Sequence, residues 1–169
     1  MAAETPGRDV HLVGSFPLAD AAEVFRTANA ILGERLKRIP DGETGPRANW
    51  IAYQYAYFAQ HPQLEFVSDP VDHETMVEVI LGPEHKRDGE VQATPLRIKP
   101  GVAPNQLKFE ATGYAENAIA SYDAFRELKA SGAVHGAARL QVSFPTPFAP
   151  VFAYMDPDQF SLIYPAYKS

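Results

Sequence analysis

The segment from residue 38 to residue 50 gathers side chains that could form a ligand site. Asp41, Glu43 and Arg47 lie close together in it, interspersed with glycines. The segment runs from the end of a short apolar strand into a helix. Such strand-to-helix turns, at the carboxyl ends of parallel strands, hold the ligand sites of α/β proteins. The alternative interpretation is purely structural, with Asp41 in a tight turn, Glu43 near a helix N-terminus and Arg47 in solvent.

The composition is that of an acidic chain with the size of one domain. Its 169 residues, 46% of them hydrophobic, are enough for a single domain with a core. The net charge of -6 and the lack of a basic patch argue against nucleic-acid and membrane partners, and favour a small molecule or a protein. No apolar run suits a signal peptide or a membrane span, so we expect a cytoplasmic protein. The sequence contains no cysteine, which excludes thiolate metal sites.

Short apolar runs alternate with helical patterns over the first 60 residues. We expect strands at residues 10–13 and 36–39, and helices at residues 21–32 and 47–60. Asp20, followed three residues later by Glu23, forms a capping-box pattern that predicts the start of the first helix. Gly33 predicts its end.

The alternation is interrupted between residues 61 and 104. This segment is rich in turn-forming and charged residues and has two β-like stretches, 76–81 and 96–99, so we expect an inserted β-hairpin at the surface. The elements expected after it are a strand at 106–109, a helix at 114–130, a strand at 139–144, a loop at 145–150 and a helix starting near 156. The expected inner stripe of the helix at 114–130 is Ala115, Ala118, Ile119, Tyr122 and Phe125.

Four strands that alternate with helices predict a mainly parallel sheet with right-handed crossovers. The loops after the first, second and fourth strands should then meet at one edge and form a single ligand site. The substrate-binding residues that we expect there are Gly14, Ser15, Asp41, Glu43, Arg47 and Phe144. We assign no catalytic residue. The five histidines show no metal-ligand spacing, so we expect no metal ligand among them.

The two motifs after the first two strands resemble those of a known enzyme family. Gly14-Ser15-Phe16-Pro17, and Gly42-Glu43 followed by an arginine at the start of a helix, resemble the catalytic barrel of cobalamin-independent methionine synthase and its relatives in the uroporphyrinogen decarboxylase superfamily. In that family these motifs hold the amino-acid portion of homocysteine. The resemblance implies that Ser15 binds this portion through its backbone and hydroxyl, and that Glu43 binds its ammonium.

The resemblance also implies a fold. It is α/β, the first half of a (β/α)8 barrel of the TIM-barrel type, with about four βα units in a single domain of residues 1–169 and the inserted segment 61–104. The family's zinc ligands (a histidine, two cysteines and a glutamate) lie on later strands. We therefore expect no cofactor within this chain, with zinc and a folate methyl donor only if a C-terminal half is present. Two open strand edges imply either a homodimer or that missing half as a partner.

Three functions stand as hypotheses. The first is a methionine-synthase-like methyl or alkyl transferase that acts on a thiol or amino acid; this chain would supply substrate-binding loops without the zinc site, so that alone it would be inactive. The second is a non-catalytic or partner-dependent half-barrel module. The third is a relative of uroporphyrinogen decarboxylase, which acts on a carboxylated substrate without a metal. The third would require arginines in the first strand-to-helix loop, and residues 14–20 contain none.

Overall fold

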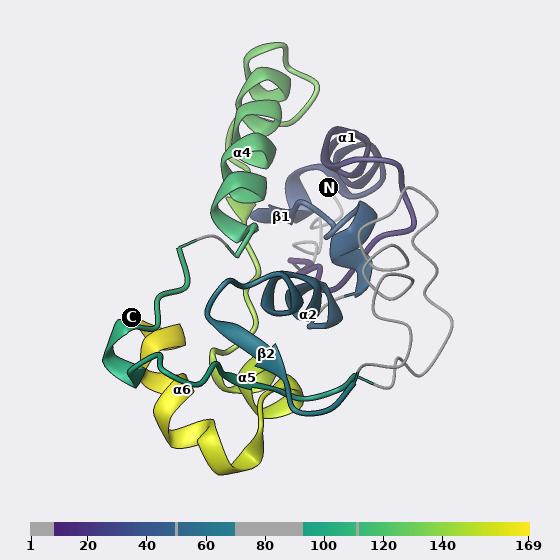
Figure 1. The fold of residues 1–169 in the computed structure, drawn as a ribbon. Helices are drawn as coiled ribbons and strands as arrows, with labels where there is room; N and C mark the ends of the chain where they lie inside the picture. Colours follow the sequence, from purple (N-terminus) through teal and green to yellow (C-terminus); the bar gives the residue numbers. More distant parts are fainter. Residues whose placement is uncertain (1–8, 50, 70–92, 111) are drawn as a thin grey trace, which may run out of the picture. The chain divides into compact units, whose positions relative to one another are not determined.

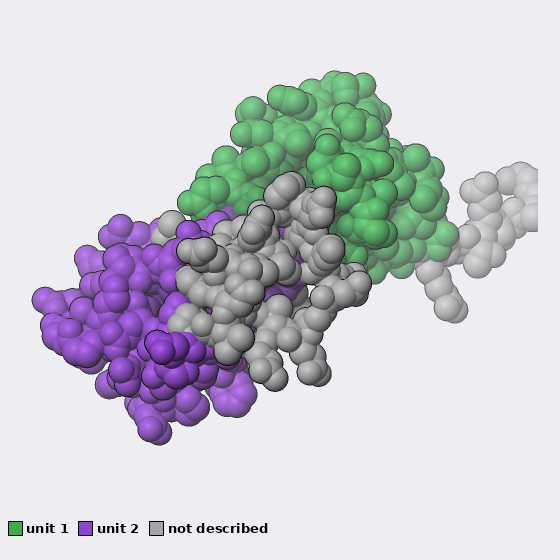
Figure 2. Space-filling view, turned by 45° about the vertical axis from the view of Figure 1, so that its right-hand side comes forward, with its two compact units in different colours: residues 1–45, 115–143 green, residues 46–114, 144–169 purple. Residues whose placement is uncertain are grey.

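The computed structural model describes residues 9–49, 51–69, 93–110 and 112–169 (Figure 1). The chain is a mixed α/β protein with more helix than strand. It divides into two compact units, one of residues 1–45 and 115–143 and the other of residues 46–114 and 144–169 (Figure 2). No helix within the described ranges has the length and apolar character needed to cross a lipid bilayer.

The first unit contains a pair of parallel strands and two long helices. Its elements are α1 (Ala21–Leu32), the 3-10 turn η1 (Gly33–Arg35), β1 (Arg38–Pro40), α4 (Tyr114–Ala130, all but its first residue) and β4 (Arg139–Gln141). In the parallel pair, Ile39 of β1 lies opposite Leu140 of β4. Both side chains face a core that contains Phe25 of α1 and Phe125 of α4. The rings of these two phenylalanines meet edge to face, with centroids 5.2 Å apart.

The expected four-stranded parallel sheet is not formed by the part of the chain that the structure describes. The first predicted strand, residues 10–13, is reduced to a single parallel bridge between Val10 and Leu36. The described strands form two sheets of two strands each, one parallel and one antiparallel. What holds from the prediction is the parallel orientation of β1 and β4, and a parallel contact between the segments on either side of α1.

Helix α1 begins and ends where the sequence predicts. The Asp20 side chain accepts a hydrogen bond from the backbone N–H of Glu23 at 2.8 Å. The Glu23 carboxylate accepts one from the backbone N–H of Ala19, also at 2.8 Å, one residue before the cap. These bonds are reciprocal, as in a capping box. Gly33 ends the helix with a positive φ of 50°, a conformation that glycine adopts without strain.

Helix α4 has the predicted bounds, but its buried face is different. Phe125 of the predicted stripe is buried, but Ile119 and Tyr122 are 64% and 54% exposed, and Ser121, which was not predicted, is buried. The prediction was wrong at these positions because it followed only the apolar side chains. Ser121 turns inward because its hydroxyl donates a hydrogen bond to the buried carboxylate of Asp41, at 2.9 Å.

The second unit combines an antiparallel strand pair with short helices from both ends of its sequence. Its elements are the 3-10 turn η2 (Gly45–Asn49, all but its first residue), α2 (Ala52–Ala59), β2 (Leu64–Phe66), β3 (Leu96–Ile98), η3 (Pro104–Gln106), α5 (Phe148–Tyr154), η4 (Pro157–Gln159) and α6 (Phe160–Lys168). Helix α5 packs against both α2 and α6. Their shared core includes Phe58, Leu96, Val151 and Ile163, all fully buried.

Two sequence predictions about this unit are wrong. Residues 106–109 do not form a strand, because side chains take up the backbone groups of Lys108. Its N–H donates to Gln63 Oε1 at 3.2 Å, and its carbonyl oxygen lies 2.8 Å from His61 Nε2. Residues 145–150 are not all loop, because α5 starts within them. Pro150 lies in the first turn of α5, where a missing N–H costs no helical hydrogen bond.

The expected inserted hairpin is described only in part. The stretch 76–81 lies outside the described residues. The other stretch contains β3, which pairs with β2 in antiparallel fashion, with Leu64 opposite Ile98. Residues near both ends of the segment 61–104 therefore lie side by side in the second unit.

A buried glutamine joins three parts of the second unit. Gln54 of α2 is fully buried, and its Nε2 donates to the backbone carbonyl of Thr112 at 2.7 Å. Its Oε1 accepts a hydrogen bond from the hydroxyl of Tyr167 in α6, at 2.8 Å. Burial raises the pKa of Tyr167 to about 12, because the charged phenolate would lose its hydration.

This pKa predicts that the chain loses stability at alkaline pH. An unfolded tyrosine releases its proton near pH 10, whereas folded Tyr167 keeps it until about pH 12. Stability from this group is therefore complete below pH 10 and is lost as the pH rises through that window. We expect Tyr167→Phe to flatten the fall in the free energy of unfolding, measured in urea between pH 8 and about pH 11.5. Because burial also raises the pKa of Tyr55 and Tyr154, part of the fall should remain. An unchanged slope in the variant would contradict the assignment to Tyr167.

Candidate functional site

Two loops of the first unit come together, one after the bridge at Val10 and the other after β1. The hydroxyl of Ser15 donates a hydrogen bond to Glu43 Oε2 at 3.0 Å. The backbone N–H of Phe16 donates to the carbonyl oxygen of Gly42 at 2.8 Å. A side-chain bond and a backbone bond thus join the two loops that the sequence analysis selected. Both loops follow parallel segments, which explains why they lie at the same edge.

Asp41 is a buried residue that stabilises the loop carrying Glu43. It is only 2% exposed, and its Oδ1 accepts a hydrogen bond from the backbone N–H of Glu43 at 3.1 Å. Its Oδ2 accepts the hydroxyl hydrogen bond from Ser121 in α4. A buried carboxylate is retained only where donors compensate its lost hydration. Asp41 therefore fixes the backbone of the loop that carries Glu43, and we regard it as a positioning residue.

The backbone of the Asp41 loop is unusual at two successive residues. Gly42 has a φ of +79°, and a Cβ added there would lie 2.7 Å from Val24 Cγ2 and 3.2 Å from Phe16 Cβ. Only glycine fits this turn without moving its neighbours. Glu43 follows with a φ of +47°, the only positive φ of a non-glycine residue in the described chain. A left-handed glutamate costs about 1–2 kcal/mol, and such strain is concentrated at functional sites.

The Glu43 carboxylate remains able to bind a cation. Its side chain is half-buried, and Oε2 is bonded to Ser15. Among the described residues, Oε1 accepts no further hydrogen bond. A carboxylate of this kind binds an ammonium through a charge-assisted hydrogen bond. The polar atoms at this edge can therefore hold a small molecule that carries an amine.

The other sequence-predicted residues lie nearby in the first unit or belong to the second. Gly14 precedes Ser15 with a φ of +91° in the same loop. Arg47 lies half-buried in η2 of the second unit. Phe144 also belongs to the second unit, where it is 60% exposed and meets the ring of Tyr114 edge to face at 5.6 Å. The structure therefore brings Gly14, Ser15, Asp41 and Glu43 together in the first unit. Arg47 and Phe144 belong to the second unit.

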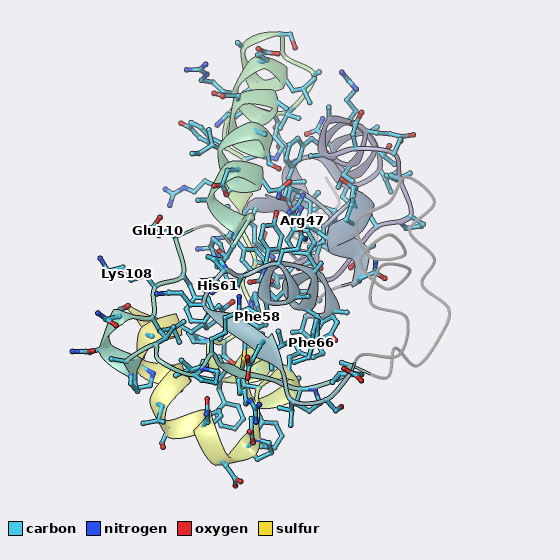
Figure 3. The ribbon with its side chains drawn as sticks, viewed as in Figure 1. Arg47, Phe58, His61, Phe66, Lys108 and Glu110 are labelled. Carbon is cyan, nitrogen blue, oxygen red and sulfur yellow. The ribbon has the colours of Figure 1, made fainter. Side chains whose placement is uncertain are left out.

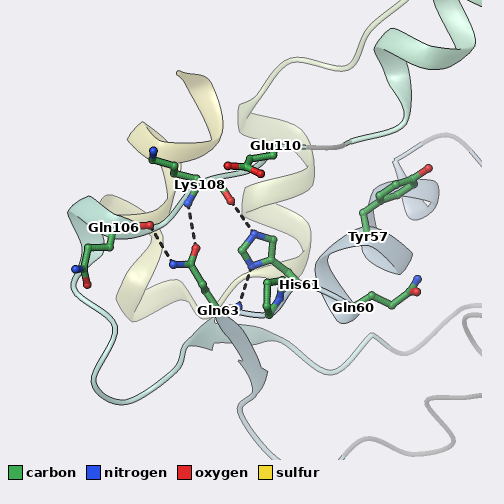
Figure 4. Close-up of a pocket in the computed structure, with 8 residues that line it drawn as sticks. Tyr57, Gln60, His61, Gln63, Gln106, Lys108 and Glu110 are labelled. Carbon is green, nitrogen blue, oxygen red and sulfur yellow. Dashed lines mark hydrogen bonds between the residues drawn. The ribbon is translucent and has the colours of Figure 1, made fainter.

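The second unit contains an open pocket of about 670 Å³, with several polar residues in its lining, that was not predicted from the sequence. It lies between the end of α2 and residues 106–110 (Figure 3). One wall is fixed by Gln63, which donates to the Gln106 carbonyl oxygen at 3.0 Å and accepts from Lys108 N–H (Figure 4). The sequence did not predict this pocket, because the residues of its two walls are more than 40 positions apart in the chain.

His61 lies in this pocket, but its ring nitrogens are both engaged. Nδ1 accepts a hydrogen bond from the backbone N–H of Gln63 at 3.2 Å, so the proton is on Nε2, which donates to the Lys108 carbonyl oxygen (Figure 4). The ring also lies against Phe109, with centroids 4.9 Å apart. His61 therefore holds residues 106–110 in place, and neither nitrogen is available to a substrate.

The residues of this chain do not fit the zinc site of cobalamin-independent methionine synthase, the family whose motifs they resemble. That site needs two thiolates, and this sequence contains no cysteine. In the described ranges, no three histidine, aspartate or glutamate side chains gather closely enough to hold a metal ion.

Comparison with known proteins gives no relative. No family model, no curated protein and no solved structure matches the chain.

Proposed function

We propose that the first unit binds the amino-acid portion of a thiol substrate for a methyl or alkyl transferase of the methionine-synthase type. The observation that carries this proposal is the hydrogen bond from Ser15 to Glu43, which joins the two motifs behind the family resemblance. In this proposal the chain supplies part of a cytoplasmic (β/α)8 barrel and contributes substrate binding. The zinc and the folate methyl donor would be contributed by a further half of such a barrel.

The proposed roles follow from the geometry of the two loops. Glu43 takes the substrate ammonium on its free oxygen, while Ser15 holds the other oxygen in place. Asp41 and Ser121 keep the loop in its strained conformation before the substrate arrives. Preorganisation of this kind reduces the ordering that binding would otherwise require. The thiol end of the substrate extends away from these residues, and its methylation needs groups that the described residues do not supply.

The direct test is binding of homocysteine to the purified chain by calorimetry, with 4-mercaptobutanoate as the analogue that lacks the amine. The wild-type chain should prefer homocysteine. Glu43→Gln keeps the shape of the side chain but removes its charge, so it should weaken homocysteine binding about tenfold to a hundredfold. The same variant should bind the two ligands about equally, because the preference for homocysteine comes from the contact between its ammonium and the Glu43 carboxylate, which the variant lacks.

The matched control is Glu127→Gln, which makes the same charge change at an exposed position of α4. It should leave the preference for homocysteine intact. If the wild-type chain binds both ligands equally, or if the two variants behave alike, the proposal is wrong.

A second candidate is a partner-dependent module, and exposed apolar residues favour it. In the first unit Val13 is 71% exposed, and Val142, directly after β4, is 38% exposed. In the second unit Phe148 and Phe152 stack on each other at 5.1 Å, and both are exposed. Such side chains become buried when a further copy or a partner chain covers them.

This candidate predicts self-association of the purified chain. Light scattering at tens of micromolar should give a mass above the 18.6 kDa monomer, or show poor solubility. Val142→Lys should shift the chain towards the monomer, because a charged side chain beside a strand opposes pairing. A monodisperse monomer with cooperative unfolding would contradict the candidate.

A further inference from the structure

The amino ends of β1 and β4 carry a group of positive charges. Lys37, Arg38 and Arg139 line an open hollow of about 250 Å³, together with the small side chain of Ala137. This volume far exceeds the ~15 Å³ that a single water needs. The hollow belongs entirely to the first unit and shares no residue with the loops of Ser15 and Glu43.

The strand register places the two arginines side by side. Arg38 of β1 lies opposite Arg139 of β4 in the parallel pair. The next residue on each strand, Ile39 and Leu140, faces the core against α1 and α4. Because successive side chains of a strand alternate between its faces, both arginines project from the face away from that core. They are exposed to solvent.

Among the described residues, Lys37 is the one cation of this hollow that pairs with a carboxylate. Lys37 forms an ion pair with Asp9. Within the described residues, no carboxylate lies within salt-bridge distance of Arg38 or Arg139. Like charges at opposed positions of neighbouring strands are unfavourable. The chain as a whole has a net charge of -6, so two adjacent arginines without a carboxylate partner are not a consequence of its composition.

We propose that this hollow binds a small dianion, either a phosphate group or a dicarboxylate. The guanidinium group is planar and presents paired donors, which match the oxygens of phosphate and carboxylate groups. Two such groups on adjacent strands can hold one dianion between them. Lys37 adds a third positive charge, which Asp9 partly offsets.

Binding of inorganic phosphate and of succinate, each compared with sodium chloride at the same ionic strength, tests the proposal. Calorimetry on the full chain should show saturable binding of at least one of the two dianions. The double variant Arg38→Gln/Arg139→Gln should weaken it about tenfold or more. The double variant Arg26→Gln/Arg126→Gln has the same change in net charge at exposed positions of α1 and α4, and should bind like the wild type.

The outcomes separate the two sources of the ligand. Phosphate binding without succinate binding supports a phosphate group, and the reverse supports a dicarboxylate. Arg38→Lys/Arg139→Lys keeps the charges but not the planar forks, so an intermediate loss supports recognition by the guanidinium groups. Absence of saturable binding, or equal losses in the two glutamine double variants, would overturn the proposal. Glu43→Gln should leave the dianion affinity unchanged, which keeps this test independent of the proposed amino-acid site.

Discussion

Replacement of Gly42 by alanine should destabilise the chain by about 3 kcal/mol. The added methyl group would lie 2.7 Å from Val24 Cγ2, and the left-handed φ of +79° disfavours any residue with a Cβ. The first effect is overpacking of a buried contact, and the second is backbone strain. Both act on the turn between Asp41 and Glu43, so the loop should shift as well as lose stability. Urea unfolding of the purified variant measures the total.

Gly132→Ala separates the two effects. Gly132 has nearly the same φ, +78°, but an added Cβ would meet nothing within 4 Å. This control should therefore lose only about 1 kcal/mol, from the backbone conformation alone. The remaining difference of about 2 kcal/mol measures the contact with Val24 and Phe16. Equal losses in the two variants would mean that the turn is not tightly packed as described.

Replacement of Asp41 by alanine should destabilise the first unit by about 2–4 kcal/mol. It leaves the buried Ser121 hydroxyl and the partly buried N–H of Glu43 without their acceptor. Asp41→Asn keeps one acceptor oxygen and should cost less. A double-mutant cycle with Ser121→Ala should give a coupling energy of about 1–2 kcal/mol, because the two side chains touch.

The control for this cycle is an exposed ion pair on the same helix. Asp123 and Arg126 lie 3.4 Å apart and are both more than half exposed, so Asp123→Ala should cost about 0.5 kcal/mol or less. A coupling energy near zero between Asp41 and Ser121 would show that Asp41 does not hold the loop through α4.

The sequence predicted local elements better than it predicted their pairing. The cap at Asp20 and the bounds of α4 were correct, because these features depend on neighbouring residues. The buried face of α4 was predicted correctly at Phe125 but not at Ser121, which is buried by a hydrogen bond to a residue 80 positions away. Likewise, residues 106–109 did not become a strand, because side chains of Gln63 and His61 took up the backbone groups of Lys108.

In the candidate site, too, the local motifs were predicted from the sequence and the long-range contacts were not. The motifs at Ser15 and Glu43 were visible in the sequence, and parallel strands predicted that their loops would meet. The positive φ of Glu43 and the support from Asp41 and Ser121 depend on tertiary contacts, so they became apparent only in the structure. The basic hollow at Arg38 and Arg139 needed the register of β1 and β4, which residues about 100 positions apart do not reveal in sequence.

An NMR titration of the ¹⁵N-labelled chain with homocysteine tests directly whether the loops of Ser15 and Glu43 bind the amino acid. We expect the amide signals of Ser15, Phe16 and Glu43 to shift with one common binding curve, while that of Gly132 stays fixed. Shifts confined to Gln63 and Lys108 would place the ligand in the pocket of the second unit. That result, or no saturable shift at the two loops, would contradict the proposed amino-acid site at Ser15 and Glu43.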